Sequence, residues 1–193
     1  MQSPPHKVPC MQAADEQQLI LQAREGDHEA FGCLVERYMK QAYNIAYGFV
    51  NNHHDAEETA QEAFIRAYQS MSSFRGEAKF GTWLYRIVMN LSLNRLEQTR
   101  KRRERHMDNP DIGKMIAESD HSGEVDVTGH IERALHELPL LQRATVILRH
   151  IDGLSTKQVS RILRCSEGTV KTHLFRGLEK MRAKLQYLRE DGI

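Results

Sequence analysis

Apolar side chains recur every three or four residues along most of this 193-residue chain, a spacing that places them on one face of an α-helix. The clearest such stripe consists of Phe31, Leu34, Val35, Tyr38, Ala42, Ile45 and Phe49. Two more stripes lie within residues 60–71 and 84–91, and a shorter helix is predicted over residues 16–24. We find no stretch with the strict alternation of a half-buried strand. The pattern therefore predicts an all-α fold.

One segment interrupts this periodicity. Residues 106–128 have no sustained apolar stripe and are rich in acids and turn-forming residues, which is typical of a flexible linker. We therefore predict two small helical domains, over residues 15–105 and 129–190. Residues 1–14 hold three of the five prolines and predict a disordered tail, which includes Cys10. Met1 and Met11 are both candidate starts, and we expect a chain beginning at Met11 to be fully active.

Residues 154–185 contain two short amphipathic helices separated by a tight break. Ser155 and Gln158 have the spacing of a capping box at the start of the first helix, and Ser166 can cap the second. Val159 and Ile162 supply the buried stripe of the first helix. Two helices joined in this way form a helix-turn-helix, here over residues 155–180, whose second helix can enter the major groove of DNA.

Charge is strongly patterned although the formal net charge is only +1. Residues 63–105 carry ten basic and three acidic side chains, and residues 161–189 carry eight basic and two acidic ones. Residues 15–62 have the opposite balance, with ten acids and three bases. The two basic blocks indicate two surfaces for a polyanion, and the acidic block indicates a surface for a different partner.

The second helix of the helix-turn-helix supplies the candidate base-reading residues. Arg176 can make a bidentate contact to guanine, Lys171 a simpler one, and Phe175 can touch a thymine methyl group. Phe175 lies at the edge of the apolar face, so a packing role is its alternative. The candidates on this helix are Thr169, Lys171, Thr172, Phe175 and Arg176.

The first basic block mixes aromatic and basic side chains, a combination that suits single-stranded DNA. Its candidates are Phe74, Arg75, Lys79, Phe80, Trp83 and Arg86, with Asn90 and Asn94 one turn apart further on. Phe80 and Trp83 have a core role as their alternative, whereas Phe74 sits in a predicted loop and is the stronger candidate for a base contact. Arg100, Lys101, Arg102 and Arg103 form a basic run suited to phosphate contacts.

Asp55, Glu58 and Glu62 are spaced by three and four residues and predict an acidic ridge on one helix. Its alternative is an ordinary solvated surface. His53 and His54 precede this ridge, but adjacent side chains on a helix diverge, so we predict no metal site. No phosphate-binding loop or nucleophile–base set is visible in the sequence, and we expect neither a catalytic residue nor a cofactor.

These segments resemble, in family order, the extracytoplasmic-function sigma factors of bacterial RNA polymerase. The N-terminal domain of that family is similar to "GDHEAFGCLVERY", "DAEETAQEAFIRAY" and "SSFRGEAKFGTWLYRIVMNLSLNRLEQTRKRR". Its C-terminal domain is similar to "GLSTKQVSRILRCSEGTVKTHLFRGLEKMRAKL". The resemblance covers about residues 15–105, as sigma region 2, and 129–189, as sigma region 4.

The resemblance implies a role for each surface. The helix with Asp55, Glu58, Gln61, Glu62 and Phe64 would dock on the clamp helices of the polymerase β′ subunit. The segment from Phe74 to Asn94 would read and open the downstream (−10) element, and the helix-turn-helix would read the upstream (−35) element in duplex DNA. The C-terminal domain would also contact the β flap, and an anti-sigma factor is an expected partner.

Several residues depart from the pattern usual in that family. Glu58 stands where Asp is common, Asn94 where Asp is frequent and Glu97 where Arg is frequent. Ser160 replaces a favoured Ala, and Arg164 stands where Gly often adopts a left-handed conformation. These departures bear on which promoter is read.

Two other functions compete with this interpretation. A stand-alone helix-turn-helix repressor or activator would leave the acidic ridge and the aromatic-basic segment unexplained, and a nucleic-acid enzyme would need a catalytic group. The chain has no apolar run near the roughly 18 residues of a membrane span and no secretory signal. We therefore expect a cytoplasmic protein without direct membrane insertion, held at the inner membrane face only through an anti-sigma factor.

Overall fold

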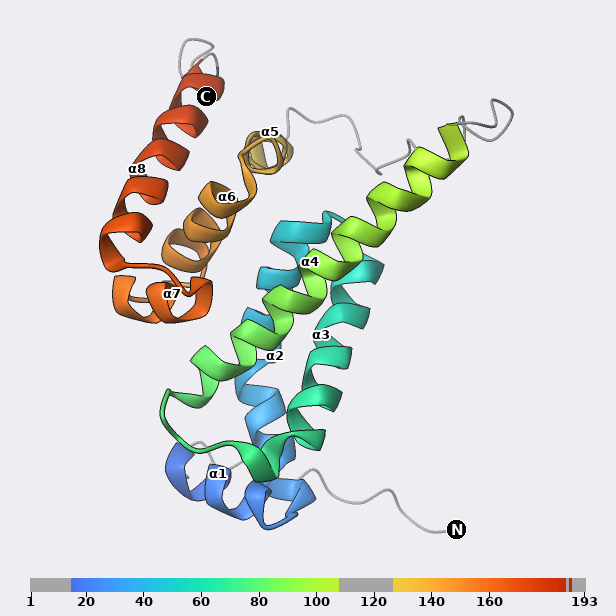
Figure 1. Cartoon of the computed structure of the whole chain (residues 1–193), viewed down its shortest axis with the longest axis vertical. Helices are drawn as coiled ribbons and strands as arrows, with labels where there is room; N and C mark the ends of the chain where they lie inside the picture. Colours follow the sequence, from blue (N-terminus) through green and yellow to red (C-terminus); the bar gives the residue numbers. More distant parts are fainter. Residues whose placement is uncertain (1–14, 108–126, 187, 189–193) are drawn as a thin grey trace.

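The computed structural model describes residues 15–107, 127–186 and 188, the side chains of residues 103–107 excepted. These residues form eight α-helices, a short 3-10 turn and a π-helical turn, with no strand among them, which confirms the predicted all-α fold (Figure 1). The predicted tail over residues 1–14 and most of the predicted linker over residues 106–128 lie outside the described residues.

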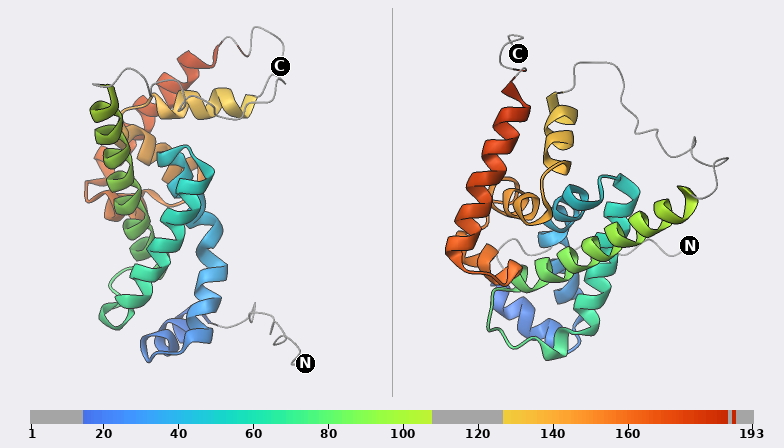
Figure 2. Two further views of the ribbon diagram at one scale, coloured as in Figure 1. Left: turned by 90° about the vertical axis from the view of Figure 1, so that its right-hand side faces the viewer. Right: turned by 45° about the horizontal axis from the view of Figure 1, so that its top comes forward.

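The N-terminal half contains four helices: α1 Glu16–Arg24, α2 His28–Val50, α3 His53–Gln69 and α4 Phe80–Met107. Each of the first three begins after a short polar residue whose side chain accepts a hydrogen bond from a backbone N–H group of the first turn. These capping residues are Asp15, Asp27 and Asn52. Asn51 ends α2 in a left-handed conformation, with φ of 52°, so the chain turns directly into α3. These local signals position α2, α3 and α4 side by side (Figure 2).

Small residues allow α3 to approach its neighbours closely. Ala56, Ala60, Ala63 and Ala67 are fully buried along one stripe of this helix. Leu34, Ile45 and Phe49 of α2 and Leu84 and Val88 of α4 are also buried in the same core. The predicted helix at residues 16–24 is confirmed as α1, whose Leu19 and Ala23 close one end of this core.

The C-terminal half contains α5 Val127–His136, α6 Leu140–Val146, a π turn over Ile147–Ile151, α7 Thr156–Leu163 and α8 Glu167–Lys184. The predicted capping box is confirmed, since the side chains of Ser155 and Gln158 satisfy each other's backbone N–H groups. Ser166 caps α8, as predicted, by accepting the backbone N–H of Thr169 at 3.0 Å.

The two halves are packed against each other, a contact that the sequence did not predict. Ile147 is fully buried and lies against Gly48 of α2, where a Cβ atom would come within 2.5 Å of the isoleucine Cδ1. The hydroxyl group of Tyr47 donates to Glu132 of α5 at 3.1 Å. Helix α7 lies against α4, so the helix-turn-helix is held beside the N-terminal bundle (Figure 1).

Candidate functional site

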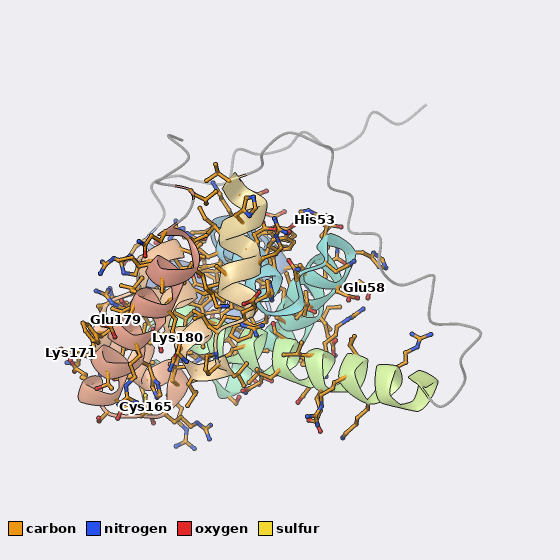
Figure 3. The ribbon with its side chains drawn as sticks, turned by 90° about the horizontal axis from the view of Figure 1, so that it is seen from above. His53, Glu58, Cys165, Lys171, Glu179 and Lys180 are labelled. Atoms are coloured by element: carbon orange, nitrogen blue, oxygen red, sulfur yellow. The ribbon has the colours of Figure 1, made fainter. Side chains whose placement is uncertain are left out.

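The helix-turn-helix presents its predicted base-reading residues on one open face. Val170 and Gly177 point inward on α8, and Gly177 lets α8 approach α6 so closely that a Cβ there would lie 2.9 Å from Val146 Cγ2. The opposite face carries the five exposed candidates Thr169, Lys171, Thr172, Phe175 and Arg176. Phe175 is 63% exposed, so the packing alternative for this residue is wrong. Figure 3 shows Lys171 at the outer edge of α8.

The turn between α7 and α8 depends on a left-handed residue. Arg164 has φ of 52° and ends α7, at the position where glycine was noted as usual in the family. A side chain with a Cβ atom adopts this conformation at some cost in free energy. The turn nevertheless directs α8 away from the N-terminal half, so the candidate face stays open.

The aromatic segment before and within α4 is a small core. Phe74 is 6% exposed and Phe80 is fully buried; the Phe74 ring lies 5.0 Å from Trp83 and 6.0 Å from Phe80, centroid to centroid. Phe74 lies in a loop, as predicted, but its ring is buried against α4, so it is not open to a base in this structure. Phe80 takes its core alternative, whereas Trp83 is half-buried, and Arg75 and Lys79 are exposed beside them.

Three predicted polar contacts lie further along α4. Arg86 is half-buried and donates through Nε to the carbonyl oxygen of Arg161 at 2.8 Å, so α7 of the helix-turn-helix covers it. Asn90 and Asn94 are exposed. The helix continues to Met107 and carries Arg100, Lys101 and Arg102 on exposed positions near its end, while the side chain of Arg103 lies outside the described residues.

The acidic ridge on α3 exists, but it is paired with cations. Arg95 of α4 donates to Asp55 Oδ1 through Nη2 at 2.7 Å and through Nε at 3.1 Å, and the same Nη2 donates to Glu58 Oε2. Glu62 pairs with Arg66 on the same helix at 2.5 Å. The hydrogen bond and charge of Arg95 hold the pKa of the Glu58 carboxyl below its ordinary value.

The other members predicted for this surface differ in exposure. Gln61 is exposed, whereas Phe64 is 5% exposed and packs into the core, so its aromatic face is not available to a partner in this structure. Arg95 was missed by the sequence analysis. It lies 37 and 40 residues from its partners in the chain, and no local spacing signals the pairing. Figure 3 places Glu58 on α3, far from Lys171.

The described part of the chain offers neither a metal site nor a membrane span. Its histidine, cysteine, aspartate and glutamate side chains make no group of three that could hold a metal ion. None of its helices is long and apolar enough to cross a membrane. The features present are an open helix-turn-helix face, a basic long helix and an acidic ridge on a separate surface. They are typical of a helical, two-domain DNA-binding protein.

Comparisons with known proteins specify this class. Residues 34–102 match the family model for sigma-70 region 2, and residues 129–181 match the model for sigma-70 region 4. The chain belongs to the extracytoplasmic-function (ECF) sigma factors of RNA polymerase, as the resemblance implied. Promoter-directed transcription initiation as an alternative sigma factor is therefore its function, and the stand-alone repressor or activator is not favoured.

Relatives share most of their length with this chain. The ECF sigma factor SigW of Bacillus subtilis is 35% identical over 181 residues, which cover 88% of this chain and 96% of SigW. The ECF sigma-E factor of Haemophilus influenzae is 33% identical over 183 residues, covering 90% of this chain and 96% of the relative.

Two solved structures share the fold. CnrH, solved in complex with the cytosolic domain of CnrY, has a TM-score of 0.71 at 23% identity and covers 89% of this chain and 97% of its own. The sigma factor RpoE of Bartonella quintana, solved with the anti-sigma factor NepR, has a TM-score of 0.64 at 24% identity. The match covers 81% of this chain and 96% of RpoE. At these identities the likeness concerns the fold.

Proposed function

We propose that this sigma factor docks on core RNA polymerase through the acidic ridge of α3 and selects promoters through two separate DNA-reading surfaces. The observation that carries the proposal is that the ridge and the open face of α8 occur in one chain on different surfaces. A protein that binds DNA alone would leave this acidic surface without a role. The clamp helices of β′ are the partner that the family resemblance implies for the ridge.

The upstream element is read by α8 in this proposal. Arg176 and Lys171 project from the open face and can reach base edges in a major groove, with Phe175 available to a thymine methyl group. The residues at both ends of α7 and at the start of α8 position this face, because the capping box, Arg164 and Ser166 together fix the turn.

The downstream element is read by the start of α4 and the loop before it. Arg75, Lys79, Asn90 and Asn94 are exposed and available to DNA. Arg86 is engaged by the backbone of α7, so its use on DNA requires α7 to leave α4. Separation of the two halves on polymerase would also allow them to reach two promoter elements, with residues 106–128 as the connection. Arg100 to Arg103 would hold phosphates.

We also propose an anti-sigma factor as regulator and a cytoplasmic location. The family resemblance supports both; RpoE was solved with the anti-sigma factor NepR, and CnrH with the cytosolic domain of CnrY. The β flap is the further polymerase contact proposed for the C-terminal domain.

Binding to cognate core polymerase by ridge variants tests the docking proposal. Reversing Asp55 and Glu58 would set two cations against Arg95 and endanger the contact between α3 and α4. Glu62 forms an ion pair with Arg66 on its own helix, so Glu62→Lys leaves the bridge between α3 and α4 intact and is the cleaner change. Glu36→Lys on the exposed side of α2 is the matched control.

Glu62→Lys should weaken core binding by about 30-fold or more, since a paired interfacial charge that becomes repulsive costs about 2 kcal/mol or more. Glu36→Lys should bind core as wild type does. Equal affinities for wild type and Glu62→Lys, with both proteins folded by circular dichroism, would remove the ridge from the docking surface.

A further inference from the structure

Arg95 is a cation on α4 that occupies two of the three carboxylates of the acidic ridge. Its side chain is 29% exposed, and its Nη2 contacts both Asp55 Oδ1 and Glu58 Oε2. Asp55 is 31% exposed and Glu58 is 45% exposed. The contact to Asp55 is therefore the sheltered one, and the contact to Glu58 faces the surface that a partner would approach.

Glu58 has both carboxylate oxygens engaged. Oε2 accepts from Arg95, and Oε1 lies 3.1 Å from Nε2 of His54, one helical turn earlier. The third ridge carboxylate, Glu62, is paired with Arg66. With two arginines against three acids, the ridge carries far less negative charge than the sequence spacing suggests. A cation from polymerase that approaches Glu58 therefore meets a carboxylate whose negative charge Arg95 already offsets in part.

We propose that Arg95 is an affinity-determining residue for core polymerase, acting as an internal competitor for Glu58. The inference rests on the proposed docking role of the ridge. In the free protein Arg95 bridges Asp55 and Glu58, and on docking its bond to Glu58 is exchanged for one from a basic side chain of polymerase. Two hydrogen bonds to Asp55 keep the side chain of Arg95 bound to α3 while the exchange takes place.

Two properties of an exposed ion pair make this exchange feasible. Such a pair contributes about 0–1 kcal/mol in water, so releasing Glu58 costs little. Arginine can donate several hydrogen bonds in a fixed fork, so Arg95 stays bound to Asp55 after one donor is released. The competition nevertheless weakens docking, because part of the attraction between Glu58 and polymerase replaces an attraction that existed already.

The test is a double-mutant cycle on core binding by the full chain. The variants are Arg95→Gln, Glu58→Gln and the double variant, with Arg24→Gln on the exposed end of α1 as a control for the loss of one positive charge. A fluorescently labelled chain titrated with core polymerase gives each dissociation constant, and urea unfolding gives each stability.

Arg95→Gln should bind core about two- to fivefold more tightly than wild type, the range set by one exposed ion pair. It should also unfold at lower urea concentration, because α3 and α4 lose a bridge. A purely structural role would lower stability without tightening core binding. Arg24→Gln should leave core affinity unchanged, and the gain from Arg95→Gln should disappear in the Glu58→Gln background.

The outcomes separate the inference from the docking proposal beneath it. If Glu58→Gln weakens core binding but Arg95→Gln does not strengthen it, the competitor role is wrong and the docking ridge stands. If neither Glu58→Gln nor Glu62→Lys affects core binding, the ridge itself is not the docking surface. If Arg24→Gln tightens core binding as much as Arg95→Gln, net charge alone explains the effect and Arg95 has no specific role.

Discussion

Replacing Asp152 with asparagine should stabilise the protein in a way that depends on pH. Asp152 follows the π turn, and neither of its carboxylate oxygens has a hydrogen-bond partner among the described residues. Burial raises the pKa of this carboxyl from 3.8 to about 7. Its charge interacts with Tyr85 of α4 in the N-terminal half, so the carboxyl lies where the two halves meet.

The sign follows from proton binding. Between about pH 4 and 7 the folded protein keeps the Asp152 proton while the unfolded chain has released it, so raising the pH costs stability. Each pH unit across this window costs about 1.4 kcal/mol, and the whole shift amounts to about 4 kcal/mol. The contribution of Asp152 to the free energy of unfolding is fully present below the pKa of the unfolded chain. It is lost as the pH rises through the raised pKa of the folded protein.

His136 acts in the opposite direction and would hide this slope in the wild type. Burial, and secondarily the charge of Arg143, lowers the pKa of His136 from 6.5 to about 4. Its folded form is neutral where its unfolded form is charged, so its contribution increases stability as the pH rises through the same window. The informative quantity is therefore the difference between the Asp152→Asn and wild-type curves.

Urea unfolding followed by circular dichroism at a series of pH values measures that difference. Near pH 4 the neutral acid and the amide should be equally stable. The free energy of unfolding of the variant should then rise progressively above that of the wild type, reaching a plateau of about 4 kcal/mol above pH 7. Parallel curves for the two proteins from pH 4 to 8 would refute the claim that Asp152 is buried without a partner.

Three further predictions concern packing, the turn and DNA. Gly48→Ala should destabilise the chain by about 1–3 kcal/mol in urea unfolding, because its methyl group would meet Ile147. Gly32→Ala, which has open space on the same helix, should gain up to about 1 kcal/mol, and equal effects would contradict the packing of the two halves. Arg164→Gly should raise stability by about 0.5–1 kcal/mol by relieving the left-handed backbone, and a loss would show that the Arg164 side chain stabilises the turn. Arg176→Ala should cost about 1–3 kcal/mol at one base pair of the upstream element, whereas Arg102→Ala should weaken binding to all sequences and flatten the salt dependence; uniform losses in a binding assay on a promoter library would refute this division.

The parts of the fold that local spacing encodes could be predicted from the sequence. Ser155, Gln158 and Ser166 signal helix starts through contacts within three residues, and the structure has those contacts. The apolar stripes likewise identified the helices and the open face of α8. These features depend on residues near one another in the chain, so periodicity and capping rules are sufficient.

The features that were missed depend on residues far apart in the chain. Phe74 lies in a loop, as its sequence neighbours predicted, but its ring is buried against the rings of Phe80 and Trp83. Arg95 pairs with α3 only because two helices lie side by side. The contact of Gly48 with Ile147 joins residues from both halves. Local sequence spacing does not indicate any of these pairings.

Transcription from genomic DNA fragments by core polymerase, with and without this chain, tests whether the chain directs initiation to specific promoters. The 5′ ends of the transcripts are sequenced in both reactions. We predict discrete start sites that appear only when the chain is present, each preceded by two short sequence elements at a constant separation. Identical start sites in the two reactions, from core polymerase shown to be active with another sigma factor, would contradict it.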